Sequence, residues 1–169
     1  MLDARTVLFH GVYMTKNDIE IIAKSKSSVV HCPISNLDTG AGVADISYML
    51  EKDVNVSLGT DYGHTNIWEV MRLTYYLLKI NNSVQKFSAE DIFKMATVNG
   101  ANTYGLQESV GQIKEGYKAD LVFIKKSPDI ELSLNNKDFS NYLHNLLFYS
   151  KEESVKHVMV DGKWVMKDR

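Results

Sequence analysis

Three polar residues, His10, His31 and Asp61, stand at or next to the ends of short apolar runs that recur about every 25 residues. Imidazole and carboxylate groups are common ligands of a catalytic zinc ion, which keeps one position open for water. The metal lowers the pKa of that water to about 7, a neighbouring carboxylate can take its proton, and a histidine can polarise the substrate. These residue types therefore support metal-assisted hydrolysis, provided that the fold brings them together.

Other interpretations of the same stretches stay open. An aspartate before a helix often serves only as its N-cap, and a single histidine at a strand end is often structural. Ser35 and Ser57 are candidates for a Ser-His-Asp triad, although no Gly-x-Ser-x-Gly elbow is present. Cys32 is a candidate nucleophile beside His31. Adjacent strand residues point to opposite faces, however, which favours a Cys32 packed in the core.

The elements that must position these residues alternate between strand and helix. Strands are predicted at residues 6–10, 28–32 and 54–61, and helices around an apolar face at residues 19–23 and at residues 43–52 and 67–80. A capping box at residues 15–18 opens the first helix, and residues 37–42 are predicted as a loop. Such alternation predicts parallel strands joined by crossover helices, with their carboxyl ends on one side of the sheet. We therefore expect His10, His31 and Asp61 to converge there.

The last third of the chain leaves this rhythm. Helices are predicted from Ser88 onwards, near residues 101–104 and at 139–148, and a strand at 120–124. Asp161-Gly162 is a strong hairpin signal between strands at 154–160 and 163–166. The change of pattern predicts two parts, an α/β part over residues 1–106 and part of a small β-domain over residues 107–169.

Composition narrows the classes of partner. The 169 residues carry a formal net charge of −2, which gives no nucleic-acid or membrane-surface pattern. No apolar run is long enough to span a bilayer, and no signal peptide is evident. Cys32 is the single cysteine, which excludes an internal disulfide and fits a reducing cytoplasm.

Several motifs, in order along the chain, resemble those of a known family. They are Thr6-Val7-Leu8-Phe9-His10-Gly11, Val30-His31-Cys32-Pro33-Ile34-Ser35-Asn36-Leu37, Ser57-Leu58-Gly59-Thr60-Asp61, Met95-Ala96-Thr97-Val98-Asn99-Gly100-Ala101, Gly111-Gln112-Ile113-Lys114-Glu115-Gly116 and Val158-Met159-Val160-Asp161-Gly162-Lys163. Together they resemble the metal-dependent amidohydrolase superfamily. Within it, the chain is most similar to the branch of the S-adenosylhomocysteine and methylthioadenosine deaminases, guanine deaminase and the chlorohydrolases.

The resemblance implies a (β/α)8 barrel of the TIM type with a composite β-sandwich, of which this chain would supply strands six to eight and the C-terminal sandwich strands. Asp61 would bind the metal, which is zinc or iron, and act as a base. His10 would be catalytic and hydrogen-bond the attacked group or the water. His31 and Asn36 would contact the substrate or support the site from behind. A local departure from the family follows Asp61, where His64 either contacts the substrate or lies in an exposed turn before the helix that starts near Ile67.

One departure from the family is large. Its paired metal histidines, His-x-His, and its later histidine and glutamate have no match in this sequence. The resemblance therefore implies a C-terminal part, inactive alone and completed by the missing N-terminal half or by another copy of the chain. Three parallel strands cannot close an eight-stranded barrel, so their unpaired edges predict association, including a homo-oligomer.

Three functions follow as expectations. The first is zinc-dependent hydrolytic deamination of a purine or related N-heterocycle, with a small heterocyclic molecule as substrate. The second is hydrolysis of another carbon–nitrogen or a carbon–chlorine bond on the same barrel. The third is a non-catalytic remnant that serves as a binding or assembly partner.

Overall fold

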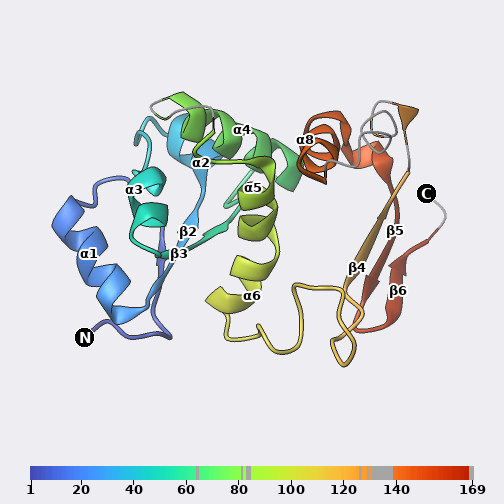
Figure 1. Ribbon diagram of the computed structural model, residues 1–169, viewed down its shortest axis with the longest axis horizontal. Coiled ribbons are helices and arrows are strands. Elements are labelled where there is room, and N and C mark those ends of the chain that lie inside the picture. Colours follow the sequence, from blue (N-terminus) through green and yellow to red (C-terminus); the bar gives the residue numbers. More distant parts are fainter. Residues whose placement is uncertain are drawn as a thin grey trace.

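Two three-stranded sheets lie near opposite ends of the molecule, with helices between them (Figure 1). The computed structural model describes residues 1–63, 65–80, 82, 85–125, 127, 128, 130 and 139–167. The first sheet contains β1 (Val7–Phe9), β2 (Ser28–His31) and β3 (Asn55–Leu58). They are parallel and ordered β1-β2-β3, with Leu8 opposite Val29 and Val29 opposite Val56. The parallel arrangement predicted from the sequence is confirmed.

Helices connect the parallel strands. The helix α1 (Lys16–Ser25) lies between β1 and β2, and α2 (Pro33–Asp38) and α3 (Ile46–Glu51) lie between β2 and β3. The longer helix α4 (Ile67–Ile80) follows β3. The predicted capping box is present at the start of α1, where the Thr15 hydroxyl accepts a hydrogen bond from the Asp18 backbone N–H and the Asp18 carboxylate accepts one from the Thr15 N–H. The helix predicted from residue 43 begins only at Ile46, because the Asp45 side chain accepts from the Tyr48 N–H and sets the start there.

The short helix α2 corrects the predicted loop, since Leu37 and Asp38 are helical. Pro33 occupies the first turn, where its fixed φ suits a helix and its missing N–H costs nothing. The buried side chains of this helix include Ser35 and Asn36. With polar residues on its inner face, α2 has no apolar periodicity for a sequence pattern to reveal.

The main core lies between the parallel sheet and its helices. Val29 and Val56, from the middle of β2 and β3, are fully buried. The buried apolar residues packed in the same cluster include Ile19, Ile22, Met49, Met71, Leu78, Ile92, Met95, Leu143 and Leu147. All four residues of β2 are buried, as expected for the central strand of a covered parallel sheet.

The remaining helices extend this core toward the second sheet. They are α5 (Ala89–Ala96), α6 (Val98–Thr103) and α8 (Phe139–Tyr149), followed by a 3-10 turn, η1 (Glu152–Ser154). The Arg72 guanidinium on α4 donates to the backbone carbonyls of Leu147 and Ser150, which joins α4 to the end of α8. The helix α8 lies in the predicted second part of the chain, yet it packs on α4 and α5 of the first part. The predicted division between residues 106 and 107 stays a prediction.

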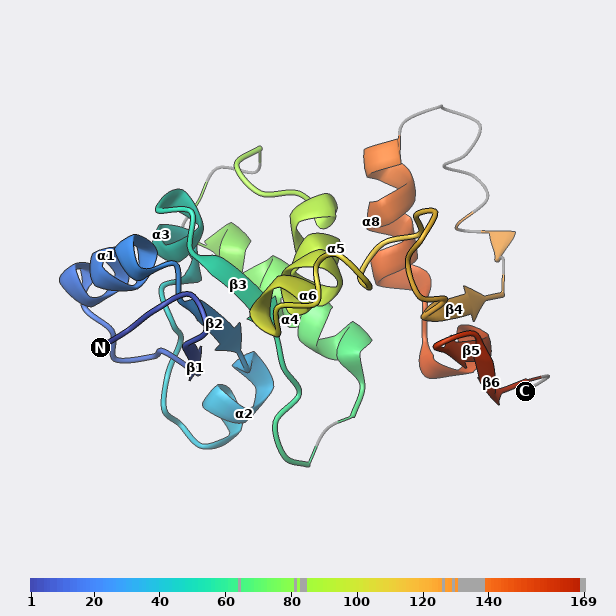
Figure 2. The ribbon, with the colours of Figure 1, turned by 90° about the horizontal axis from the view of Figure 1, so that it is seen from below.

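The second sheet is antiparallel and carries the predicted hairpin. It contains β4 (Leu121–Ile124), β5 (Val155–Val160) and β6 (Lys163–Met166), in the order β4-β5-β6. Asp161 and Gly162 form the turn with φ of 49° and 75°, the positive values that a tight hairpin requires. A view turned by 90° shows α8 beside this sheet (Figure 2).

Candidate functional site

His10 directly follows β1, and Asp61 lies three residues after Leu58, the last residue of β3, at the carboxyl edge of the parallel sheet. Both have left-handed backbones, with φ of 67° and 55°. Histidine and aspartate enter this region more readily than most residues, but the conformation still costs of the order of 1–3 kcal/mol. Strain after two strands of one sheet is characteristic of a site whose side chains are aimed by the fold.

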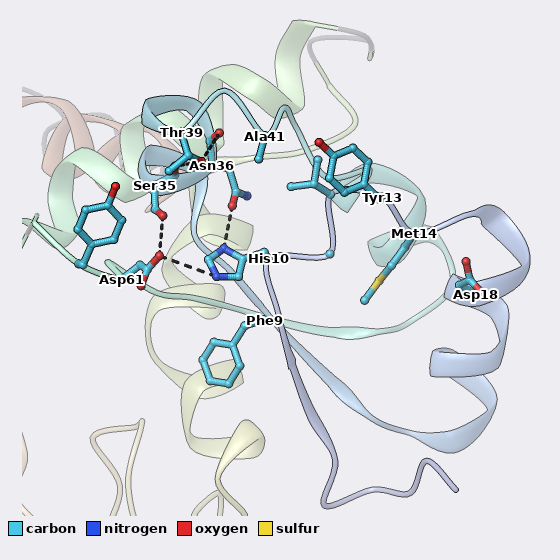
Figure 3. A pocket seen from close by; sticks show the side chains of 13 residues that line it. Phe9, His10, Tyr13, Met14, Asp18, Ser35, Asn36, Thr39, Ala41 and Asp61 are labelled. Atoms are coloured by element: carbon cyan, nitrogen blue, oxygen red, sulfur yellow. Dashed lines mark hydrogen bonds and ion pairs between the residues drawn. The ribbon is translucent and has the colours of Figure 1, made fainter.

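The two side chains meet across the strand ends. His10 Nε2 lies 3.8 Å from Asp61 Oδ2, and the side chains are 42% and 33% exposed. Figure 3 shows the His10 ring between Asp61 on one side and Asn36 on the other. The predicted convergence is therefore observed for His10 and Asp61, although they come from strands that are not adjacent.

Two neighbouring residues of α2 hold this pair. The Ser35 hydroxyl donates to Asp61 Oδ2 at 2.5 Å, and Asn36 Oδ1 lies 2.8 Å from His10 Nδ1. Ser35 was not predicted to support the site, because no spacing rule relates a serine on a short helix to a carboxylate at the end of another strand. The sequence predicted Ser35 only as a candidate triad nucleophile and as part of the family-like run around His31.

A cavity of about 600 Å³ opens in front of these groups. Its lining includes His10, Asp61, Ser35 and Asn36, together with Phe9, Gly11, Val12, Tyr13, Met14, Asp18, Thr39, Ala41 and Tyr62. Figure 3 places Tyr13 and Met14 beyond His10, away from Asp61. The mixture of aromatic walls and a few convergent polar groups suits a small planar molecule.

His31 does not line the cavity. It is fully buried, and neither ring nitrogen has a hydrogen-bond partner among the described residues. Burial, with a smaller contribution from the charge of His10, lowers the pKa of His31 to about 4. The ring is therefore neutral at pH 7. His64, the other histidine predicted near the site, lies outside the described residues.

The geometry disfavours the competing chemistries. Burial, together with the nearby charge of Asp61, raises the pKa of the Cys32 thiol to about 11, so little thiolate forms at pH 7. Cys32 is buried, as predicted. The Ser35 hydroxyl is hydrogen-bonded to Asp61 rather than to His10, and Ser57 is paired with Thr103, so neither serine forms a Ser-His contact.

Asp61 is not used as a helix cap. Instead, Asn66 Oδ1 accepts a hydrogen bond from the Trp68 N–H in the first turn of α4. The alternative in which Asp61 is simply an N-cap therefore loses its main support, because another residue performs that task.

The donor set fits part of a metal site. Asp61 offers a carboxylate at the cavity and His10 an imidazole, both suitable ligands of a borderline cation such as zinc. No group of three or more His, Cys, Asp or Glu side chains able to hold a metal occurs in the part of the chain that the structure describes. A catalytic zinc needs about three protein ligands, so these residues fit such an ion only as partial contributors.

Comparison with known proteins identifies the family. The model of the amidohydrolase family matches residues 1–165. The chain belongs to the amidohydrolase family. This assignment agrees with the motifs at the strand ends and with the parallel sheet that carries them.

Among curated relatives, this amidohydrolase chain is similar to the 5-methylthioadenosine/S-adenosylhomocysteine deaminase of Pyrococcus horikoshii. The two are 35% identical over 173 residues, which cover 99% of this chain and 39% of that protein. The chain thus spans about two-fifths of the length of the curated relatives it matches. These relatives are deaminases, as the resemblance implied.

Solved structures give the same fold. An adenosine deaminase from Xanthomonas campestris with bound zinc matches with a TM-score of 0.87 and 26% identity, over 99% of this chain and 38% of that chain. E. coli guanine deaminase matches with a TM-score of 0.83 and 27% identity, over 96% of this chain and 39% of that chain.

The predicted fold class is confirmed: the chain is an α/β portion of a TIM-type barrel followed by strands of a small β-domain. None of the described helices has the length and apolar character needed to cross a membrane.

Proposed function

We propose that this chain contributes His10 and Asp61 to the active site of a metal-dependent hydrolase that deaminates an aminopurine or a related N-heterocycle. The observation that carries the proposal is the approach of His10 to Asp61 at the strand ends, beside a cavity of suitable size. The deaminases among the relatives add support for the reaction type. Methylthioadenosine, S-adenosylhomocysteine and 5′-deoxyadenosine are the first substrates to test.

In the reaction, water replaces the exocyclic amino group, so a C–NH2 carbon becomes a carbonyl and ammonia leaves. A divalent metal, zinc before iron, supplies a water of lowered pKa when it is bound. Asp61 is the residue of this chain that would hold the metal, with further ligands from elsewhere in the active protein. Its carboxylate also takes a proton from the attacking water and returns it to the departing nitrogen.

His10 acts beside Asp61. Its Nδ1 faces Asn36 Oδ1, which accepts a hydrogen bond from Nδ1–H and leaves Nε2 directed toward Asp61 and the cavity. With its proton on Nδ1, the ring offers the Nε2 lone pair, which accepts a hydrogen bond from the attacking water. The aromatic residues of the cavity wall would exclude water from the ring faces of a bound heterocycle.

The residues that the structure describes offer only part of the ligand set of such a site. In the described part, β1 pairs only with β2, and Phe9 at its end is 54% exposed. An unpaired strand edge next to an exposed aromatic side chain favours association with more protein. We propose that an N-terminal barrel half or a second copy completes the site, that the active protein is an oligomer in the cytoplasm, and that these 169 residues alone do not turn over.

The test compares the protein purified from its source with the isolated 169-residue chain. Both are assayed for bound metal and for ammonia release from the three named nucleosides, adenosine and guanine. We expect zinc-dependent turnover in the native protein and none in the isolated chain. Turnover by the isolated chain would contradict its incompleteness. A metal-loaded native protein that releases no ammonia but cleaves an amide or a carbon–chlorine bond would replace the deaminase proposal. A metal-free native protein without turnover would favour a binding role.

A further inference from the structure

The helix α2 places two consecutive side chains on the two residues that carry the proposed chemistry. Ser35 contacts Asp61 and Asn36 contacts His10, at 2.5 and 2.8 Å. We infer that Ser35 and Asn36 are positioning residues: Ser35 selects the Asp61 oxygen that faces the reaction, and Asn36 selects the His10 nitrogen. This inference deepens the proposed function and depends on it for its kinetic tests.

Ser35 divides the Asp61 carboxylate into two unlike oxygens. Oδ2 accepts the Ser35 hydroxyl and is also the oxygen near His10 Nε2. Among the residues that the structure describes, no group donates to Oδ1. A short hydrogen bond from a hydroxyl to a carboxylate is strong enough to hold the carboxylate rotation. Oδ1 is then the oxygen left for a metal or for the attacking water.

Asn36 acts in the same way on the imidazole. Its Oδ1 accepts from Nδ1, which keeps a proton on that nitrogen and leaves Nε2 for the cavity side. Asn36 is almost fully buried, and its Nδ2 has no partner among the described residues. A buried unpaired donor costs about 1–3 kcal/mol, so this asparagine is a poor choice for stability alone. Its contact with His10 gives a reason for its presence.

The backbone of α2 is fixed at the same two residues. The Thr39 hydroxyl donates to the Ser35 carbonyl at 2.8 Å, and the Asn36 carbonyl accepts from the Ala41 N–H, also at 2.8 Å. The segment that follows the helix therefore fixes the backbone carbonyls of Ser35 and Asn36, whose side chains contact Asp61 and His10. Functional groups need this kind of support to stay within about 0.5 Å of a productive geometry.

The kinetic test uses three serine variants of the native protein. Ser35→Ala removes the hydroxyl and Ser35→Thr keeps it. The control Ser109→Ala removes a hydroxyl that donates to the Leu106 carbonyl, and Ser109 does not line the cavity. We expect Ser35→Ala to lower kcat by about 10- to 100-fold with KM changed by less than about 2-fold. Ser35→Thr should recover most of kcat, and Ser109→Ala should match the wild type. Equal losses in Ser35→Ala and Ser35→Thr, or a loss confined to KM, would overturn the role of Ser35.

Two readouts do not require deamination. Zinc affinity, measured by competition with a chelator, should fall about 10- to 100-fold in Ser35→Ala and stay near wild type in Ser109→Ala. The ¹⁵N spectrum of His10 should show a protonated Nδ1 in the wild type and in Asn36→Asp, and a mixture of tautomers in Asn36→Ala. If the wild type binds zinc without deaminating, the proposed function fails while these readouts still decide the positioning roles. Unchanged zinc affinity and an unchanged spectrum would overturn them, as would a native protein that binds no zinc.

Discussion

The two sheets of this chain differ in how deeply their residues are buried. In the parallel sheet, every residue of β2 is buried, and both Val56 and Ser57 of β3 are buried. In the antiparallel sheet, no described residue of β4, β5 or β6 is buried, and Val122 and Val165 are 58% and 62% exposed. The same β-branched residue type therefore lies in the core of one sheet and on the surface of the other.

This difference in burial indicates which sheet can hold reactive side chains in a fixed position. The polar cavity lies at the edge of the buried sheet, and none of its lining residues comes from the exposed sheet. A buried strand whose neighbours are packed on both faces can hold a strained residue such as Asp61 at its end. An exposed sheet lacks that support. We therefore expect substitutions in the two sheets to have different consequences.

The largest effect is expected at Asp61. Asp61→Asn keeps the side-chain size and tolerates the positive φ, but it removes the negative charge and the ability to take a proton. Deaminase turnover should fall about 100- to 10,000-fold, the usual contribution of a general base. The free energy of unfolding, measured with urea, should change little. An active Asp61→Asn protein would place the chemistry elsewhere in the molecule.

The next effect compares the same substitution in both sheets. Val56→Ala removes two buried methyl groups from β3 and should lower the free energy of unfolding by about 2–3 kcal/mol, because a cavity remains. Val122→Ala in β4 should change it by less than about 0.5 kcal/mol, because that side chain already contacts solvent.

Urea titrations of both proteins, in the assembly state of the wild type, test this contrast. Equal losses would mean that the exposed face of the second sheet is covered in the functional protein. The comparison between the sheets would then apply to the isolated chain only.

Much of this arrangement could be predicted from local patterns. Alternating strand and helix signals predicted the parallel sheet and hence the approach of His10 to Asp61. The Thr15–Asp18 capping box and the turn at Asp161-Gly162 were predicted from residue types with a direct backbone role. These features depend on interactions within a few residues or on the geometry common to parallel sheets.

The rest depends on which face of an element is covered, and the sequence does not contain that information locally. Because all of β2 is buried, its period of two did not reveal that His31 shares a face with the core residue Val29. Ser35 and Asn36 are polar and buried, so they interrupted the apolar pattern that would have revealed α2. Their roles emerge only when β1, β3 and α2 are placed together.

A pH effect of intermediate size is expected from His31. Burial lowers its folded pKa to about 4, below the ordinary value of 6.5 for an unfolded chain. As pH falls below 6.5, the unfolded state takes up the proton and the folded state does not, so stability is lost between pH 6.5 and 4. The free energy of unfolding should be about 2 kcal/mol lower at pH 5 than at pH 8 from this group alone.

The variant His31→Phe isolates this contribution, because it removes the titrating group and retains an aromatic ring in the core. Urea unfolding of both proteins at pH 8 and pH 5 gives the difference between their pH dependences. Between pH 8 and pH 5, the free energy of unfolding of the variant should fall by about 2 kcal/mol less than that of the wild type. Parallel pH profiles would show that His31 is protonated or hydrated in the folded protein.

The smallest effect is expected at Thr15, where a substitution should change stability without changing turnover. Asp18 lines the cavity, yet its carboxylate accepts from the Thr15 N–H and hydroxyl, which lower its pKa. Thr15→Ala removes the cap and should lower the free energy of unfolding by about 1 kcal/mol, whereas Thr15→Ser should retain it. Turnover and KM should stay within about 2-fold of wild type, since the chemistry is assigned to the strand ends.

A marked change in KM in the alanine variant alone would mean that Asp18, released from Thr15, reaches the ligand. The site would then extend from the strand ends to the start of α1.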